Sequence, residues 1–117
     1  MFRESLENII NNCDGAVAGI LMGFDGIAVD SVCRDGEVDV NTISMEYSFV
    51  LGQVRKAAEL LEVGPLQEVA IRSDSLTFVI RVLNEEYFLG VALKPDGNFG
   101  KGRFLMRMAA PQLLSEL

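Results

Sequence analysis

The residues of this sequence that could do chemistry lie in two short stretches. The first runs from Asp96 to Gly102 and superficially resembles a phosphate-binding loop, because it is rich in glycine and ends in Gly-Lys-Gly. The true motif, G-x-x-x-x-G-K-[ST], lets backbone amides surround the phosphates while its hydroxyl binds Mg²⁺. Here the first spacing is too short, and Gly102 stands where the hydroxyl residue is needed. We therefore expect a polar loop before a helix and no nucleotide site.

The second stretch is an acidic segment that contains Asp35, Glu37 and Asp39, whose carboxylates invite a Ca²⁺ interpretation. A calcium loop of the EF-hand type needs a longer, regular pattern of oxygen ligands that closes with a bidentate Glu. The segment lacks that pattern, so we interpret it as a solvated loop.

Composition removes the commonest catalytic routes. The sequence contains no His, so it offers no imidazole base, no Ser–His or Cys–His pair and no His ligand for zinc. Cys13 and Cys33 do not form a C-x-x-C pair and are expected as two small buried apolar side chains. The net charge is −7, with 17 acidic residues against 10 basic ones, which disfavours binding to nucleic acid. We expect a protein that is not an enzyme and that holds neither a metal nor a cofactor.

Basic residues crowd the start of the last predicted helix, where Lys101, Arg103 and Arg107 follow one another closely. Cations are mildly unfavourable at this end of a helix because of the helix dipole. We interpret the group as a solvated face. The alternative is a site for an acidic surface of a partner.

The elements that must position these residues follow from the spacing of apolar side chains. Spacings of three and four predict helices, and alternation or short apolar runs predict strands. Asp25-Gly26 between two apolar runs predicts a hairpin. The predicted helices cover residues 2–13, about 42–63 and about 103 onward, and the predicted strands cover 16–22, 27–32, 66–73, 76–83 and 87–94.

Individual residues refine these elements. Asn41 or Thr42 is expected to cap the second helix at its N-terminus. Pro111 is expected to break or kink the last helix near Ala110. On the last strand, Gly90 and its neighbour Ala92 are small, which would permit a helix to approach that face.

The fold class follows from the order of the elements. The length of 117 residues is that of one domain, so residues 1–117 are taken as a single unit. Three short turns make their flanking strands antiparallel. We predict an α/β layered fold with the order α-β-β-α-β-β-β-α, in which a five-stranded antiparallel sheet of order 2-1-5-4-3 carries helices on both faces.

An interface is expected at the edge of this sheet. The mean hydropathy of +0.28 is high for a small soluble monomer, which hints at a buried contact between chains. Leu66–Ser73 would be an edge strand, and such a strand is a liability unless it is paired or blunted. It alternates well and has no internal Pro. We therefore expect it to pair antiparallel with a second copy, and its candidate interface residues are Leu66, Glu68, Ala70 and Arg72.

The second helix carries two rows of side chains. One row is an apolar stripe expected to seal the core: Ile43, Tyr47, Val50, Leu51, Val54, Ala58 and Leu61. The other row is mixed, and its candidate interface residues are Glu46, Phe49, Gln53, Lys56 and Leu60. An exposed Phe within a polar row favours a binding role for this face. In the alternative, Phe49 packs against its own domain.

The sequence also resembles a known family. Gly19-Ile-Leu-Met-Gly-Phe-Asp-Gly-Ile-Ala-Val-Asp-Ser31 resembles the first hairpin of the Roadblock family of dynein light-chain and GTPase-regulator domains. An opening helix that ends just before Asp14-Gly15-Ala16-Val17 also fits that family, as does the segment Gly102 to Ala110. The resemblance covers essentially the whole chain.

The resemblance implies a homodimer or heterodimer, in which edge strands pair across the dimer and the middle helices lie together on one face. Members of the family bind Ras-like small GTPases as activators or scaffolds, or bind dynein intermediate chains. An acidic, stand-alone copy most resembles the bacterial MglB-like subunits. Those act on a partner GTPase without a catalytic arginine of their own.

We therefore expect a dimeric regulator or scaffold of a Ras-like small GTPase, of the activating type but without its own arginine finger. A purely structural dimeric adaptor, with no effect on nucleotide turnover, is the alternative. The amphipathic, charged start of the chain and the lack of a long apolar run predict a cytoplasmic protein without membrane insertion.

Overall fold

The computed structural model describes residues 2–34 and 38–117 and has the predicted order of elements. In chain order they are α1 (Phe2–Asn11), β1 (Ala16–Gly23), β2 (Ala28–Cys33), α2 (Val40–Leu61), β3 (Glu68–Arg72), β4 (Thr77–Val82), β5 (Tyr87–Leu93) and α3 (Phe99–Glu116).

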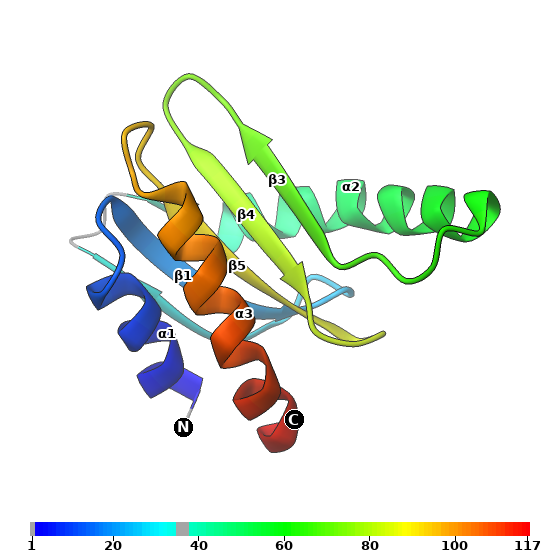
Figure 1. The fold of residues 1–117 in the computed structure, drawn as a ribbon, viewed down its shortest axis with the longest axis horizontal. Coiled ribbons are helices and arrows are strands. Elements are labelled where there is room, and N and C mark those ends of the chain that lie inside the picture. The colour runs from blue at the N-terminus through cyan, green and yellow to red at the C-terminus, as the bar shows by residue number, and fades with distance from the viewer. Residues whose placement is uncertain (1, 35–37) are drawn as a thin grey trace.

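The five strands form one antiparallel sheet in the order β2-β1-β5-β4-β3, which confirms the prediction. Figure 1 shows α1 and α3 on one face of the sheet and α2 on the other. β1 lies between β2 and β5 and is buried along its whole length. Its near-continuous apolar sequence suits that position, because a strand covered on both faces has no polar side to present.

Two apolar layers hold the helices on the sheet. The layer under α1 and α3 includes Leu6, Ile9, Leu21, Val79, Leu89 and Met106. The layer under α2 includes Ile20, Met22, Leu51, Phe78, Ile80 and Phe88. Alternate residues of β4 enter opposite layers, as the period of a strand requires. The two free edges of the sheet, β2 and β3, border both layers.

Gly90 on β5 has a different role from the one expected. A Cβ atom added there would lie 2.5 Å from Cζ of Phe78, so this glycine makes room for an aromatic ring from β4 and not for a helix. The Phe78 ring in turn packs on Tyr47 of α2, with 5.6 Å between the ring centroids. Because Gly90 has no side chain, the Phe78 ring can lie over β5 and contact Tyr47, which joins the sheet to α2.

Replacing Gly90 with alanine is therefore expected to lower the free energy of unfolding by roughly 1–3 kcal/mol, because the added methyl group overpacks a closed layer. Urea denaturation followed by circular dichroism measures the change. Gly52→Ala is the matched control, because apart from its chain neighbours and the backbone of its own helix no atom lies within 4 Å of the Cβ position at Gly52, and a helix prefers alanine. A Gly90→Ala variant as stable as the parent would contradict this packing.

Three further expectations are corrected. α2 begins earlier than expected, since the Asp39 side chain is its N-cap and accepts a hydrogen bond from Thr42 N at 3.2 Å. α3 also begins earlier, at Phe99, and continues through Pro111 to Glu116. Pro111 has no N–H to donate to the Arg107 carbonyl oxygen, and both residues are exposed, so water is available to bond that oxygen.

The two cysteines differ in their surroundings. Cys13 is buried as expected, and burial, with a smaller effect of Asp14, raises the pKa of its thiol. Cys33 is exposed, which corrects the expectation of two buried cysteines. It lies at the end of the edge strand β2, where no helix covers it, and its thiol donates to the Val38 carbonyl oxygen at 2.9 Å.

α2 is longer than the sheet face that it covers. Its four buried residues are Val40, Ser44, Ser48 and Leu51, and none lies beyond the middle of the helix. The second half extends past the sheet in Figure 1. Two members of the predicted core stripe are exposed, Val50 at 48% and Leu61 at 70%. Leu61 lies beyond the reach of the sheet. Val50 precedes the buried Leu51, but it is turned about 100° away from it around the helix, so it lies off the side that Ser44, Ser48 and Leu51 bury.

Among residues 2–34 and 38–117, no helix is both long enough and apolar enough to cross a bilayer.

Candidate functional site

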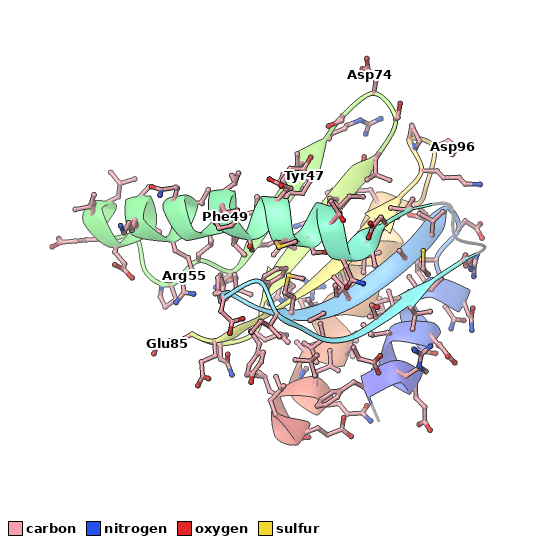
Figure 2. The ribbon with its side chains drawn as sticks, turned by 180° about the vertical axis from the view of Figure 1, so that it is seen from behind. Tyr47, Phe49, Arg55, Asp74, Glu85 and Asp96 are labelled. Atoms are coloured by element: carbon pink, nitrogen blue, oxygen red, sulfur yellow. The ribbon has the colours of Figure 1, made fainter. Side chains whose placement is uncertain are left out.

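The mixed row of α2 lies on the solvent side of the helix, as predicted. Glu46, Gln53 and Lys56 are exposed. Phe49 is 68% exposed and Leu60 is 85% exposed, so neither packs into its own domain. Figure 2 looks onto this side of the molecule and shows Phe49 on the helix. The alternative in which Phe49 packs against its own domain is wrong for the protomer.

The exposed apolar surface of α2 is wider than this row. Met45, Val50, Leu61 and Val63 are also large, apolar and exposed. The sequence analysis placed Val50 and Leu61 in the core because their spacing matches the core stripe. It did not single out Met45 or Val63. Together with Phe49 and Leu60, these four residues form the outer apolar face of α2. Several large apolar side chains exposed on one helix and its end mark an interaction site more often than a single exposed residue does.

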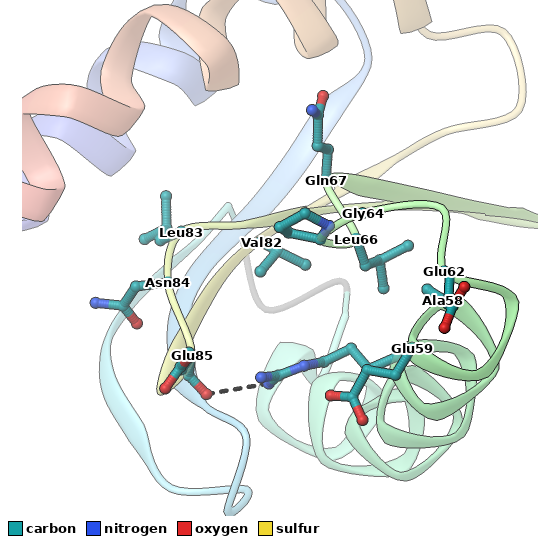
Figure 3. A pocket seen from close by; sticks show the side chains of 12 residues that line it. Ala58, Glu59, Glu62, Gly64, Leu66, Gln67, Val82, Leu83, Asn84 and Glu85 are labelled. Atoms are coloured by element: carbon teal, nitrogen blue, oxygen red, sulfur yellow. Dashed lines mark hydrogen bonds between the residues drawn. The ribbon is translucent and has the colours of Figure 1, made fainter.

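A groove lies beneath the free half of α2. Its volume is about 640 Å³, and its walls are the last turns of α2, the connection to β3, and the end of β4 with the turn after it. Figure 3 shows Leu66 and Val82 on one side of the groove, and Ala58 of α2 and Glu62, which follows the end of that helix, on the other. The groove exists because the second half of α2 has no sheet beneath it.

Arg55 fixes one wall of this groove. It donates a hydrogen bond to the Glu85 carbonyl oxygen at 3.0 Å, drawn as the dashed line in Figure 3. Its guanidinium also lies 4.0 Å from the centroid of the Phe24 ring. Arg55 is the one arginine in the α2 sequence, and these contacts hold it against its own domain.

The candidate residues of β3 separate in space. Glu68, Ala70 and Arg72 alternate along the strand, and Ala70 pairs with Val79 of the layer under α1 and α3, so their side chains point to that side. Leu66 precedes the strand, packs against the layer under α2 and lines the groove. The structure therefore places the mixed row of α2 on one face of the sheet and the side chains of Glu68, Ala70 and Arg72 on the other. The backbone edge of β3 lies between these two groups.

The backbone of β3 presents its hydrogen-bonding groups outward at alternate residues. Gln67 O accepts from Val82 N, and Ser73 N donates to Leu76 O, so the odd-numbered residues face β4. In an antiparallel strand the N–H and C=O of one residue point to the same side, and those of the next residue to the other. Glu68, Ala70 and Arg72 therefore direct their N–H and C=O groups to the free edge.

The basic residues near the start of α3 border a smaller cavity of about 250 Å³. Arg81, Arg103 and Arg107 line it together with Glu68. Arg103 contacts Oε2 of Glu68 twice, through Nε at 2.8 Å and through an η nitrogen at 2.6 Å. The hydrogen bond to Glu68 raises the pKa of the Arg103 guanidinium. The Arg103 side chain is thereby tied to β3.

The stretches first considered for chemistry have structural roles. In the glycine-rich loop, Gly97 N donates to Lys94 O, Asn98 N to Asp14 O and Gly102 N to Asn98 O, so these amides are already used within the chain. Asp39 of the acidic stretch caps α2, and hydrogen bonds from Thr42 lower the pKa of its carboxyl group. Asp35 and Glu37 lie outside the described residues. Within the part of the chain that the structure describes, no group of three or more His, Cys, Asp or Glu residues could hold a metal ion.

Similarity to known proteins is found among solved structures. No family model matches the sequence, and the search of curated proteins finds no significant match. Solved structures do match. MglC from Myxococcus xanthus is 45% identical, the match covers 99% of this chain and 98% of that one, and the TM-score is 0.73.

Two more distant structures share the fold. A Roadblock/LC7 domain from Streptomyces avermitilis is 14% identical over 95% of this chain and 96% of its own, with a TM-score of 0.77. The gliding protein MglB from Thermus thermophilus is 16% identical over 92% of this chain and 82% of its own, with a TM-score of 0.80. The identity to MglC is thus well above the identity to MglB.

Proposed function

Because the chain belongs to the Roadblock/LC7 family and is a relative of MglC, we propose that it is a dimeric regulator or scaffold of a Ras-like small GTPase. The observation that carries the proposal is the outer apolar face of α2, which no described part of the chain covers, beside a sheet edge with outward backbone groups. The first surface suits a protein partner, and the second suits another strand.

Self-association uses the edge of β3 in this proposal. Two copies related by a two-fold axis pair their β3 strands, so that the sheet continues from one protomer into the other. The free half of α2 then extends beyond the edge of its own protomer. Leu60, Leu61 and the groove beneath them become the contact with the second copy, which explains why a helix of this length overhangs its sheet.

The small GTPase is proposed to bind the shared surface of the two α2 helices, with Phe49 in it. Stimulation of GTP hydrolysis by this surface would proceed without an arginine finger from α2, because Arg55 is held by Glu85 and Phe24. The same observation favours the second candidate function, a dimeric adaptor that brings proteins together and leaves nucleotide turnover unchanged.

Two measurements test this function. Light scattering of the purified chain at micromolar concentration should give twice the protomer mass of 12.8 kDa. Single-turnover GTP hydrolysis by a Ras-like GTPase from the same genome is then followed with and without the dimer, and binding is followed by calorimetry. Faster hydrolysis supports the regulator, and binding at unchanged hydrolysis supports the adaptor. A monomer, or a dimer that binds no such GTPase, overturns the proposal.

A further inference from the structure

The cavity of about 250 Å³ beside α3 is a basic site in an acidic protein. The chain carries 17 acidic residues against 10 basic ones, but three arginines line this cavity and Glu68 is the one acidic residue among its lining. The arginines are Arg81, Arg103 and Arg107. Because Glu68 balances only one of them, two positive charges are left in a small space, and the proposed function uses neither.

Two elements bring the arginines together on the side of the sheet that α1 and α3 cover. Arg81 belongs to β4 and lies on the same face as Val79, two residues earlier, which packs in the layer under these helices. Arg103 and Arg107 are four residues apart and therefore share one side of α3. The cavity thus lies across the sheet from α2, whose position Figure 1 shows.

Two of the three arginines have no partner for their charge within the described residues. Arg81 lies directly opposite Glu68 across the β3–β4 pair, but the Glu68 carboxylate bonds to Arg103 instead. Among residues 2–34 and 38–117, the side chains of Arg81 and Arg107 form neither an ion pair nor a hydrogen bond. Arg81 is also half-buried, so it gives up part of its hydration without gaining a counter-charge.

This arrangement works against the stability of the chain by itself. Arg103 and Arg107 have like charges at a helical spacing of four, where they repel each other. Lys101 adds another cation in the first turn of α3, where the helix dipole disfavours positive charge. Anions brought by a partner would relieve this repulsion, because complementary charge across an interface stabilises both sides.

We propose that this cavity binds an acidic segment of a partner protein. Carboxylates of that segment pair with Arg81 and Arg107, and an apolar side chain beside them packs on Phe104, which lines the cavity and is 46% exposed. Arginine clusters recognise acidic motifs in this way, because a planar guanidinium can donate two parallel hydrogen bonds to one carboxylate. The site adds a second partner on the opposite side of the sheet and needs neither the dimer nor the GTPase.

The surroundings of the cavity favour a carboxylate-bearing segment over phosphate. Phosphate sites at the start of a helix are built from free backbone amides. Here the amides of Lys101 and Gly102 already donate to Oδ1 and to the carbonyl oxygen of Asn98. A phosphate ion would also leave Phe104 uncovered. An anionic membrane surface is a poor partner as well, because the net charge of the chain is −7.

Glu68 occupies part of this site before any partner arrives. Its Oε2 accepts from Nε of Arg103 at 2.8 Å and from an η nitrogen at 2.6 Å. The Glu68 carboxylate therefore holds the donors that a partner's carboxylate would use. It is a built-in competitor, and its removal should make Arg103 available to the acidic segment.

Fluorescence anisotropy of a labelled peptide made of Glu-Glu-Leu repeats tests the site in the full-length chain. At low ionic strength, where surface charges are least screened, the peptide should bind the parent. A peptide of equal length made of Gln-Gln-Leu repeats should bind roughly tenfold more weakly, because it has no carboxylates. General attraction cannot produce this order, since a chain with a net charge of −7 repels an acidic peptide.

Variants locate the binding. Arg107→Glu should weaken binding of the acidic peptide roughly tenfold, and Arg81→Gln should also weaken it. Arg3→Glu on α1 is the matched control, because it makes the same change of charge at an exposed arginine outside the cavity, and its binding should stay close to that of the parent. Circular dichroism shows that each variant is folded.

Glu68→Gln gives a result of the opposite sign. It removes the competing carboxylate, so binding of the acidic peptide should become roughly tenfold tighter. A Glu68–Arg103 pair that only holds β3 against α3 would give no such gain.

The outcomes separate this site from the proposed function. Equal binding of the two peptides, or of the acidic peptide to the parent and to Arg107→Glu, overturns the inference. Inorganic phosphate that displaces the peptide at concentrations as low as the peptide's own would identify a phosphate site instead. Assemblies of the parent larger than a dimer that Arg107→Glu dissolves would identify a second copy as the occupant. A parent that is monomeric, or that binds no GTPase, overturns the proposed function alone.

Discussion

Replacing Ala70 with proline is expected to convert the dimer into a monomer that keeps its fold. Proline removes the N–H that Ala70 directs outward, and its ring occupies the space where the second strand would lie. Two such donors are lost per dimer, which amounts to on the order of 2 kcal/mol, or a ~30-fold weaker dimer, before the clash of the rings is added. The protomer tolerates the change because edge strands accept proline where the N–H faces outward.

The neighbouring residue is the matched control. Val69 faces β4, where it pairs with Ile80, so proline there breaks the ladder inside the protomer. Val69→Pro is expected to lower the free energy of unfolding by on the order of 1–3 kcal/mol, because a buried carbonyl group loses its donor. Light scattering over a dilution series and urea denaturation separate the two effects. An Ala70→Pro variant that dimerises like the parent would show that β3 is not the interface.

The second large effect is expected at Phe49. Truncation to alanine should weaken dimerisation or partner binding by roughly 2 kcal/mol or more, about 30-fold, because aromatic side chains at the centre of an interface carry much of its binding energy. The protomer should stay folded, since Phe49 is largely exposed and has little core packing to lose. Substitutions at such positions usually change the free energy of unfolding by no more than about 0.5 kcal/mol.

Met108→Ala is the control for Phe49→Ala. Met108 is 61% exposed, close to the value for Phe49, but it lies on α3, across the sheet from α2. Sedimentation velocity reports the dimer, and calorimetry with the small GTPase reports the partner. If the Phe49 variant associates and binds as the parent does, the outer apolar face of α2 is not the working surface.

Much of this fold could be predicted because its signals are local. Three antiparallel pairs, β1–β2, β3–β4 and β4–β5, follow from short turns such as Asp25-Gly26, where backbone conformation is set by the residues themselves. The pair β1–β5, which completes the strand order, joins segments far apart in the chain and has no such local signal. Period-two alternation placed Phe78 and Ile80 on one face of β4, and both lie in the layer under α2. The exposure of Phe49 also followed from its place in a polar row.

Other features depended on atoms that the sequence does not bring together. Gly90 suggests a space for a helix, but only the register of β4 against β5 shows that the Phe78 ring fills it. Pro111 suggests a break, yet α3 continues through it, and both Pro111 and Arg107, whose carbonyl oxygen loses its donor, are exposed to water. By its spacing Leu66 belongs with Glu68, Ala70 and Arg72. It precedes the first residue of β3, however, and lines the groove beneath α2.

The sequence by itself determined the order of elements, the alternation of each strand and the amphipathic pattern of α2, because these depend on residues close together in the chain. Only the tertiary structure decided which apolar residues of α2 are covered. Leu61 fits the same stripe as Leu51, and it is exposed because the sheet ends before the helix does. Val50 is exposed because the helix turns its Ser44–Ser48–Leu51 side, and not the Val50 side, toward the sheet. The reach of a sheet is set by the packing of all its strands, so the surface left for a partner is a property of the assembled fold.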